Sequence, residues 1–174
     1  VDIELYLIAG TSINKILEEV KYLKSQDISQ MQLQVCNYWN EIYNKGICRD
    51  ICDERIDMLY KRSIMVFHLL SQSGLGGMLA APEVDEDFLY CGGYGFCWGR
   101  DAAYITSAID AAGYHYMTEE FYLWAITAQS EDGSWAQRHY LDGSIAPNWG
   151  LQIDETGSIL WGVWEHYKIT KDRQ

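Results

Sequence analysis

Apolar and polar residues alternate in one stretch of the chain, residues 1–10 (VDIELYLIAG). Such alternation is typical of a strand, so this stretch is predicted to be the end of a preceding β domain. Beyond residue 10 the apolar residues recur every three or four positions, which is the period of an amphipathic helix. Helices are therefore expected from residue 11 or 12 to about 24, and over 28–45, 50–72, 101–112, 118–129 and from 154 or 156 onwards.

Small polar residues and glycines at the ends of these ranges predict the helix boundaries. A side-chain oxygen at an N-cap accepts a hydrogen bond from the first helical turn, and a glycine adopts the left-handed conformation that ends many helices. The expected N-caps are Thr11 or Ser12, Thr118, and Asp154 or Thr156, and the expected stops are the run Gly74-x-Gly76-Gly77 and Gly113.

Two long loops separate the helices. Residues 74–97 are glycine-rich and acidic, and residues 130–150 contain two Asp-Gly-Ser turns and Pro147. Helical hairpins joined by long loops suit an α/α toroid, in which paired helices form inner and outer rings and the loops at one end build a pocket. The predicted fold class is all-α: helical hairpins with long pocket-forming loops that make up part of such a toroid.

Composition narrows the function classes. With 48% hydrophobic and 14% aromatic residues, the chain is predicted to be globular, not disordered. Its net charge of −12 argues against binding to nucleic acid or to an anionic membrane, because both are negatively charged and attract basic proteins. No apolar run approaches the roughly 20 residues that cross a bilayer. A neutral sugar is indifferent to this charge, and the many Trp and Tyr residues suit a carbohydrate cleft.

Cysteines and histidines predict neither a disulfide framework nor a metal site. The five cysteines are odd in number and irregularly spaced, which favours a reducing, cytoplasmic location. Cys48 and Cys52 resemble half a metal site, but nothing of matching spacing completes it, and free thiols are expected. The four histidines are scattered, so no metal and no cofactor are expected. The chain opens at Val1 without a signal-peptide pattern, and the missing initiator Met indicates an internal piece.

Residues 94–101, Tyr-Gly-Phe-Cys-Trp-Gly-Arg-Asp, form the most informative stretch. An aromatic, glycine-rich loop here leads into the adjacent pair Arg100 and Asp101 at the start of a helix. Aromatic rings such as Tyr94 and Trp98 stack on sugar faces, and a charged pair can both donate and accept hydrogen bonds with neighbouring hydroxyls. The structural alternative is an acidic first-turn residue, Asp101, that pairs with Arg100.

Residues 148–157 form a second candidate block. Trp149 is followed by Gln152 and Asp154, an order that predicts a stacking platform with polar neighbours. The structural alternative is a capping segment in which Asp154 caps the last helix and Trp149 packs as an apolar staple. Glu165, which follows Trp164 in the middle of that helix, is expected to be a solvated surface residue.

Several ordered blocks resemble glycoside hydrolase family fifteen, the glucoamylases with their glucodextranase and trehalase-like relatives. The blocks are residues 59–83, the W-x-R-D block at 94–113, Q-x-x-D-G-x-W at 129–143, and W-x-x-Q-x-D-E-x-G at 149–157. This resemblance implies a partial (α/α)6 toroid. The implied organisation is 1–10 as the end of a β domain, 11–48 as a helical linker, and 49–174 as the first part of the catalytic domain.

The resemblance also implies an activity and a set of substrate-binding residues. Members release glucose, with inversion, from the non-reducing end of α-glucans or α-glucosides. The implied partners are a carbohydrate and the remaining part of the catalytic domain. The general acid and base are expected beyond Gln174, so no catalytic residue is assigned in this chain, which alone is expected to be inactive. The residues that match sugar-binding positions are Tyr94, Trp98, Arg100, Asp101, Trp149 and Gln152.

Two alternatives stay open. The block at 129–135 also resembles a repeat of triterpene cyclases, another α/α barrel class, although it occurs once and the acidic D-x-D-D motif is absent. A non-catalytic helical module that binds a carbohydrate or a protein partner would also fit the residues.

Overall fold

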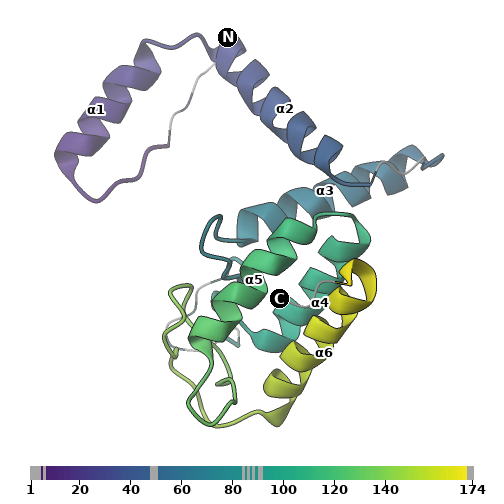
Figure 1. Ribbon diagram of the computed structural model, residues 1–174. Helices are drawn as coiled ribbons and strands as arrows, with labels where there is room; N and C mark the ends of the chain where they lie inside the picture. The colour runs from purple at the N-terminus through teal and green to yellow at the C-terminus, as the bar shows by residue number, and fades with distance from the viewer. Residues whose placement is uncertain are drawn as a thin grey trace. The chain divides into compact units, whose positions relative to one another are not determined.

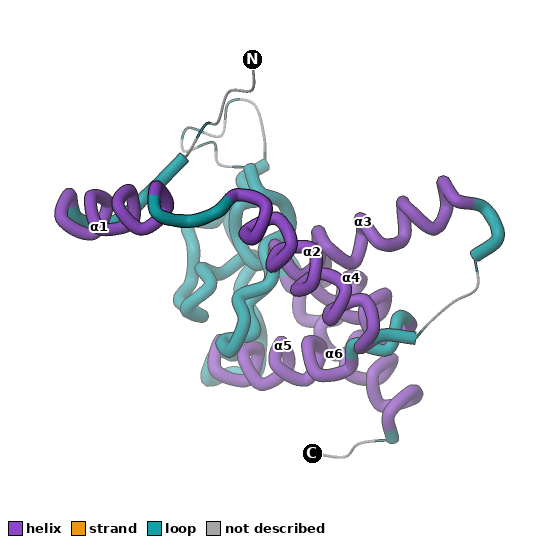
Figure 2. Tube along the Cα trace, turned by 90° about the horizontal axis from the view of Figure 1, so that it is seen from above, coloured by secondary structure: helices purple, strands orange, loops and turns teal. Residues whose placement is uncertain are grey.

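The computed structural model describes residues 5, 7–47, 51–83, 85, 87, 89 and 92–171 (Figure 1). These residues form helices and connecting loops, and no strand is drawn among them (Figure 2). The chain divides into two compact units, residues 1–42 and residues 43–174. The helices are α1 Ile13–Lys24, α2 Ile28–Lys45, α3 Glu54–Leu70, α4 Gly99–Ala111, α5 His115–Ala128 and α6 Ile153–Thr170.

The first unit contains α1 and most of α2, close to the predicted ranges. Ser12 caps α1, and its side chain accepts a hydrogen bond from the Lys15 backbone at 3.4 Å. None of the residues of α1 is buried. The strand predicted for residues 1–10 falls partly on residues outside the described set, and residues 7–10 adopt no regular secondary structure.

The second unit is built around α4. This helix packs against α3, α5 and α6, and Figure 1 shows α4, α5 and α6 side by side. Small residues permit the close contact between α4 and α6: a Cβ on Gly99 would lie 2.7 Å from the Ile159 side chain, and one on Gly162 would lie 3.1 Å from Ala103 Cβ. The helical hairpin of α4 and α5 turns at Gly113, whose φ of +87° confirms the predicted stop.

The predicted N-caps of α5 and α6 are wrong. Helix α5 begins at His115, and the buried Thr118 hydroxyl donates to the Thr106 carbonyl at 3.3 Å instead of capping the helix. Helix α6 begins at Ile153, and its N-cap residue Gln152 makes no side-chain capping bond. The Thr156 hydroxyl accepts from the Trp135 backbone at 3.1 Å, and Asp154 pairs with another helix. The side chains of Thr118, Asp154 and Thr156 therefore contact residues distant in sequence instead of capping these two helices.

The two long loops are tied together near the start of α4. Cys97 and His139 exchange a pair of backbone hydrogen bonds of 2.9 Å, which join the loop before α4 to the loop before α6. The predicted turns are present: Gly133 and Gly143 have φ values of +85° and +87°. The described helices include none with the length and apolar character needed to cross a membrane. The loops thus gather at the ends from which α4 and α6 start.

Candidate functional site

Arg100 joins the first turn of α4 to the first turn of α6. Its backbone N–H donates to Glu155 Oε2 at 2.7 Å, and its guanidinium Nη1 donates to Asp154 Oδ2 at 2.5 Å. The same Nη1 lies 3.3 Å from Glu155 Oε1. These contacts replace the pairing with Asp101 that was the structural alternative, because both carboxylates on α6 are presented to Arg100 when the helices pack.

Glu155 is fully buried, at 0% exposure. Burial raises its pKa, since the charged form loses its hydration, and the Arg100 backbone and guanidinium partly offset this effect. Asp154 is exposed, and its hydrogen bond from Arg100 lowers its pKa. The pKa of Glu155 is therefore raised and that of Asp154 is lowered, although both carboxyls contact the same guanidinium. Together these two contacts fix the orientation of the Arg100 side chain.

Asp101 follows in the first turn of α4, where a negative charge is favoured by the helix dipole. Its Oδ2 atom is buried, yet it has no hydrogen-bond partner among the described residues. Asp101 and Arg100 line a hollow of about 400 Å³ together with Tyr104 and apolar side chains that include Phe67 and Leu70 of α3. A buried acceptor without a partner is costly, so this atom is suited to a donor from a ligand.

The predicted aromatic residues gather beside Arg100. The Trp98 ring lies 5.9 Å from Tyr94 and 6.1 Å from Trp149, centroid to centroid, and 5.8 Å from the Arg100 guanidinium. Trp149 is 61% exposed and Tyr94 is 40% exposed, whereas Trp98 is only 3% exposed. Its Nε1–H donates to the Gly93 carbonyl at 3.2 Å. Trp98 therefore supports the other rings and, contrary to expectation, presents no exposed stacking surface.

Gln152 lies at the N-cap of α6, half-buried. It is thus next to the two carboxylates that hold Arg100. The structure brings the six predicted sugar-binding residues to the starts of α4 and α6 and the loops leading into them, and their contact with a sugar stays a prediction.

Sequence reasoning missed Arg138, which is 1% exposed. Its Nε donates to the Pro147 carbonyl at 2.5 Å, and its Nη1 donates to Gly92 at 2.9 Å. The guanidinium carbon also lies 4.6 Å from the Trp149 ring centroid and 5.4 Å from that of Trp98. Arg138 therefore connects the two loops by hydrogen bonds and packs its guanidinium against the rings of Trp98 and Trp149. No local sequence pattern marks this role, since its partners are 9 to 46 residues away.

A second polar cluster lies apart from this site and was also missed. Asp110 contacts His115 and His166, two of the four histidines that looked scattered in the sequence.

Two other residues singled out in the sequence belong to neither cluster. Glu165 pairs with Lys168 at 2.7 Å on α6, as expected for a surface residue. Cys97 is buried, which raises the pKa of its thiol to about 12 and makes it unreactive.

The chain resembles known glycosyl hydrolases. Residues 55–135 match the family described as "Glycosyl hydrolases family 15". The chain is also similar to the "Uncharacterized glycosyl hydrolase MJ1610" of Methanocaldococcus jannaschii, with 33% identity over 166 residues that cover 91% of this chain. No solved structure matches the chain. The comparisons thus support a region that resembles glycosyl hydrolase family 15, and the described all-helical structure is consistent with a fragment of the (α/α)6 kind.

The match covers only part of the archaeal relative. The aligned residues make up 25% of the archaeal relative, so the chain spans about a quarter of that protein's length. The match favours a glycosyl hydrolase over a terpene cyclase. It names no substrate, because the relative itself is described as uncharacterized.

Proposed function

We propose that the starts of α4 and α6 form the sugar-binding floor of an inverting glycosidase. The enzyme would release glucose from the non-reducing end of α-glucans or α-glucosides, in a reducing cytoplasm. In this proposal the chain supplies binding groups, and the remaining part of the catalytic domain supplies the general acid and base. The proposed sugar contacts are Tyr94, Arg100, Asp101, Trp149 and Gln152, with Trp98 behind them.

The observation that carries the proposal is the buried Oδ2 of Asp101, which has no partner among the described residues. A sugar hydroxyl could donate to this atom while its neighbour accepts from Arg100, whose guanidinium is held in place by Asp154 and Glu155. Charged hydrogen bonds of this kind contribute about 1.5–3 kcal/mol each. The exposed ring of Trp149 would cover the apolar face of the sugar.

The described carboxylates near Arg100 do not suit inverting chemistry. Such chemistry needs two carboxyl groups about 6.5–9.5 Å apart on opposite sides of the scissile bond. Asp154 and Glu155 instead both contact the same Arg100 nitrogen, at 2.5 and 3.3 Å. Side chains so engaged are not available to protonate a leaving group or activate water. This supports the proposal that the catalytic pair comes from another part of the enzyme.

The proposal is tested in the protein that contains this region, with maltose, isomaltose and a chromogenic α-glucoside as substrates. Asp101→Asn should lower kcat/KM on the order of 10²-fold or more, since a carboxylate contact in the transition state costs a few kcal/mol when lost. Trp149→Ala should mainly raise KM. The matched control is Asp132→Asn in an exposed turn, which should leave the rate unchanged.

Two results would count against the proposal. A folded Asp101→Asn protein with wild-type kcat/KM would leave Asp101 only a role at the helix start. Sugar binding without any hydrolysis by the parent protein would favour the alternative of a non-catalytic carbohydrate-binding module.

A further inference from the structure

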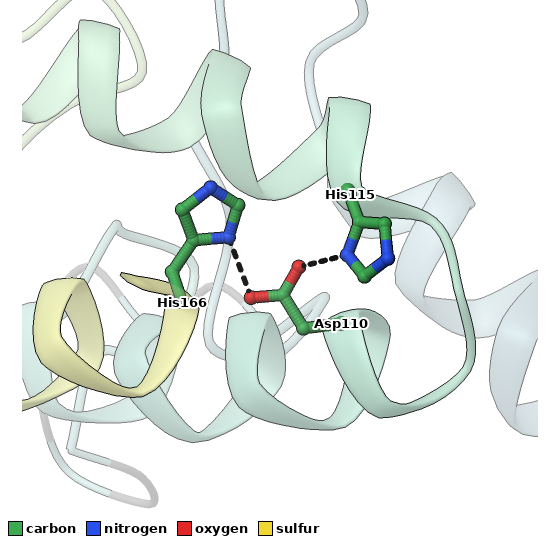
Figure 3. Close-up of side chains that lie close together, drawn as sticks. All are labelled: Asp110, His115 and His166. Carbon is green, nitrogen blue, oxygen red and sulfur yellow. Dashed lines mark hydrogen bonds and ion pairs between the residues drawn. The ribbon is translucent and has the colours of Figure 1, made fainter. Parts of the chain in front are cut away.

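Three side chains from three helices meet at the end of α4 opposite Arg100. Asp110 lies near the C-terminal end of α4, His115 begins α5, and His166 lies near the C-terminal end of α6. Figure 3 shows the Asp110 carboxylate between the two imidazole rings. His115 Nδ1 lies 2.9 Å from Oδ1, and His166 Nδ1 lies 2.8 Å from Oδ2.

Burial makes this cluster unusual. The side chains of Asp110 and His166 are 1% and 11% exposed, and that of His115 is 37% exposed. A buried carboxylate is costly unless its charge is compensated. The contacts found for it among the described residues are two imidazoles, which carry no charge in their neutral form. A cation at this point would supply the missing charge.

We propose that Asp110, His115 and His166 form a binding site for a divalent transition-metal ion of the zinc class. Two imidazoles and one carboxylate are a donor set that Zn²⁺ prefers. The donor atoms all lie within 4.8 Å of one another. Bonds of about 2.0–2.1 Å to a tetrahedral ion place neighbouring ligand atoms about 3.3 Å apart. The two nitrogen-to-oxygen contacts, which run to different carboxylate oxygens, would lengthen by a few tenths of an ångström. The widest separation in the donor set, up to 4.8 Å, would have to close by as much as about 1.5 Å through side-chain rotation.

Ion binding requires the two Nδ1 atoms to change from hydrogen-bond donors to metal ligands. In the hydrogen-bonded cluster each Nδ1–H donates to the Asp110 carboxylate. To bind the ion, each Nδ1 must instead present a lone pair, so its proton has to leave that nitrogen. A hollow of about 210 Å³ lined in part by His166, Tyr122 and Glu119 adjoins the cluster and gives water room to act as a fourth ligand.

The position of the cluster indicates a structural ion. Asp110 and Arg100 are ten residues apart on α4, which corresponds to about 15 Å along a helix. An ion here would be remote from the proposed sugar site and would bind α4, α5 and α6 to one another. The inference therefore does not depend on the proposed function.

The test is direct metal binding by the chelator-treated protein that contains this region. Titration with Zn²⁺ alone should show one equivalent bound and a higher melting temperature on binding. Co²⁺ in place of Zn²⁺ should give visible absorption bands without the strong near-ultraviolet band of thiolate ligation, which excludes binding by the cysteines. A protein that takes up no ion, or whose Co²⁺ spectrum shows thiolate ligands, would overturn the inference.

Variants separate an ion site from a hydrogen-bonded cluster. His115→Gln and His166→Gln keep an amide that can donate to Asp110, yet glutamine is a much poorer ligand for Zn²⁺ than imidazole. Each should weaken Zn²⁺ binding by tenfold or more while circular dichroism stays that of the parent. His68→Gln, at a histidine that bonds Tyr116 instead, is the matched control and should bind Zn²⁺ as the parent does. Equal affinity for Zn²⁺ in all variants would mean that these three side chains form a hydrogen-bonded cluster and no ion site.

Discussion

Glu155 is a buried carboxylate whose two oxygens both face Arg100. It is one of several residues whose role depends on contacts between helices. Arg100, Asp101 and Trp149 could be predicted from their local setting, a charged pair and an exposed ring among glycines. Glu155 and Arg138 could not, because the partner of Glu155 is 55 residues away, those of Arg138 are 9 to 46 residues away, and no local spacing encodes such contacts.

The pH dependence of stability should reveal Glu155. Because its pKa is raised in the folded protein, its contribution to stability is fully present below the unfolded pKa of about 4.5 and is lost as pH rises through the folded pKa. Glu155→Gln removes this titration. The stability advantage of the parent over the variant should therefore shrink as pH rises from 4 towards 8, as measured by urea unfolding at each pH. A constant difference over that range would contradict the raised pKa.

Arg138→Lys should destabilise the protein by about 1–3 kcal/mol, although it preserves the charge. Lysine has no planar fork, so it cannot donate to Pro147 and Gly92 at once, and a buried carbonyl is left unpaired. Chemical denaturation measures the change. Arg55→Lys, at a side chain that is 90% exposed, should have no measurable effect, and an equal effect at both positions would count against the role of Arg138.

At the scale of elements, hydrophobic spacing predicted where the helices lie but not where they begin. The ranges of α1 and α2 agree with their predicted spans, since apolar spacing is a property of a single segment. The starts of α5 and α6 were wrong because Thr118 and Thr156 bond other parts of the fold instead of their own helices. Capping residues are reliable indicators only where nothing else competes for their side chains.

Glycines in the loop after α3 provide a test at this scale. Gly76 has a φ of +89°, and a Cβ there would collide with the Glu120 carbonyl on α5. Gly74 has a φ of +78° but faces open space. Gly74→Ala should therefore cost about 1 kcal/mol from backbone strain alone. Gly76→Ala should cost roughly 3 kcal/mol or more in thermal or chemical unfolding, because strain and overpacking add. Equal costs would mean that the loop does not pack on α5 as described.

At the scale of the whole molecule, the second unit exposes large apolar side chains on α5 and α6. They include Leu123, Ile126, Leu160 and Trp164, with exposed fractions between 55% and 66%. Exposed apolar patches commonly mark surfaces that another element or protein covers. The chain spans about a quarter of its archaeal relative. Both observations fit the proposal that further helices of the catalytic domain pack against this fragment.

The polypeptide 1–174 made by itself should therefore not hydrolyse sugars. Among its described residues, Asp154 and Glu155 beside the proposed sugar site are both engaged with Arg100. Incubation of the purified polypeptide with maltose, isomaltose and a chromogenic α-glucoside should release no glucose above a heat-treated control. Glucose release that disappears in a Glu155→Gln or Glu165→Gln variant would place a catalytic carboxyl within this chain.

The buried guanidinium of Arg138 has a consequence for how fast a ligand binds. Because it connects residues 92–93, Pro147 and the Trp149 ring, these residues of the proposed sugar site are held together without any contact from a sugar. A preorganised surface loses little conformational entropy when it is occupied. Association should therefore be limited by diffusional encounter and by removal of water from the sugar, and its rate should show a weak temperature dependence without a slow loop-closing phase.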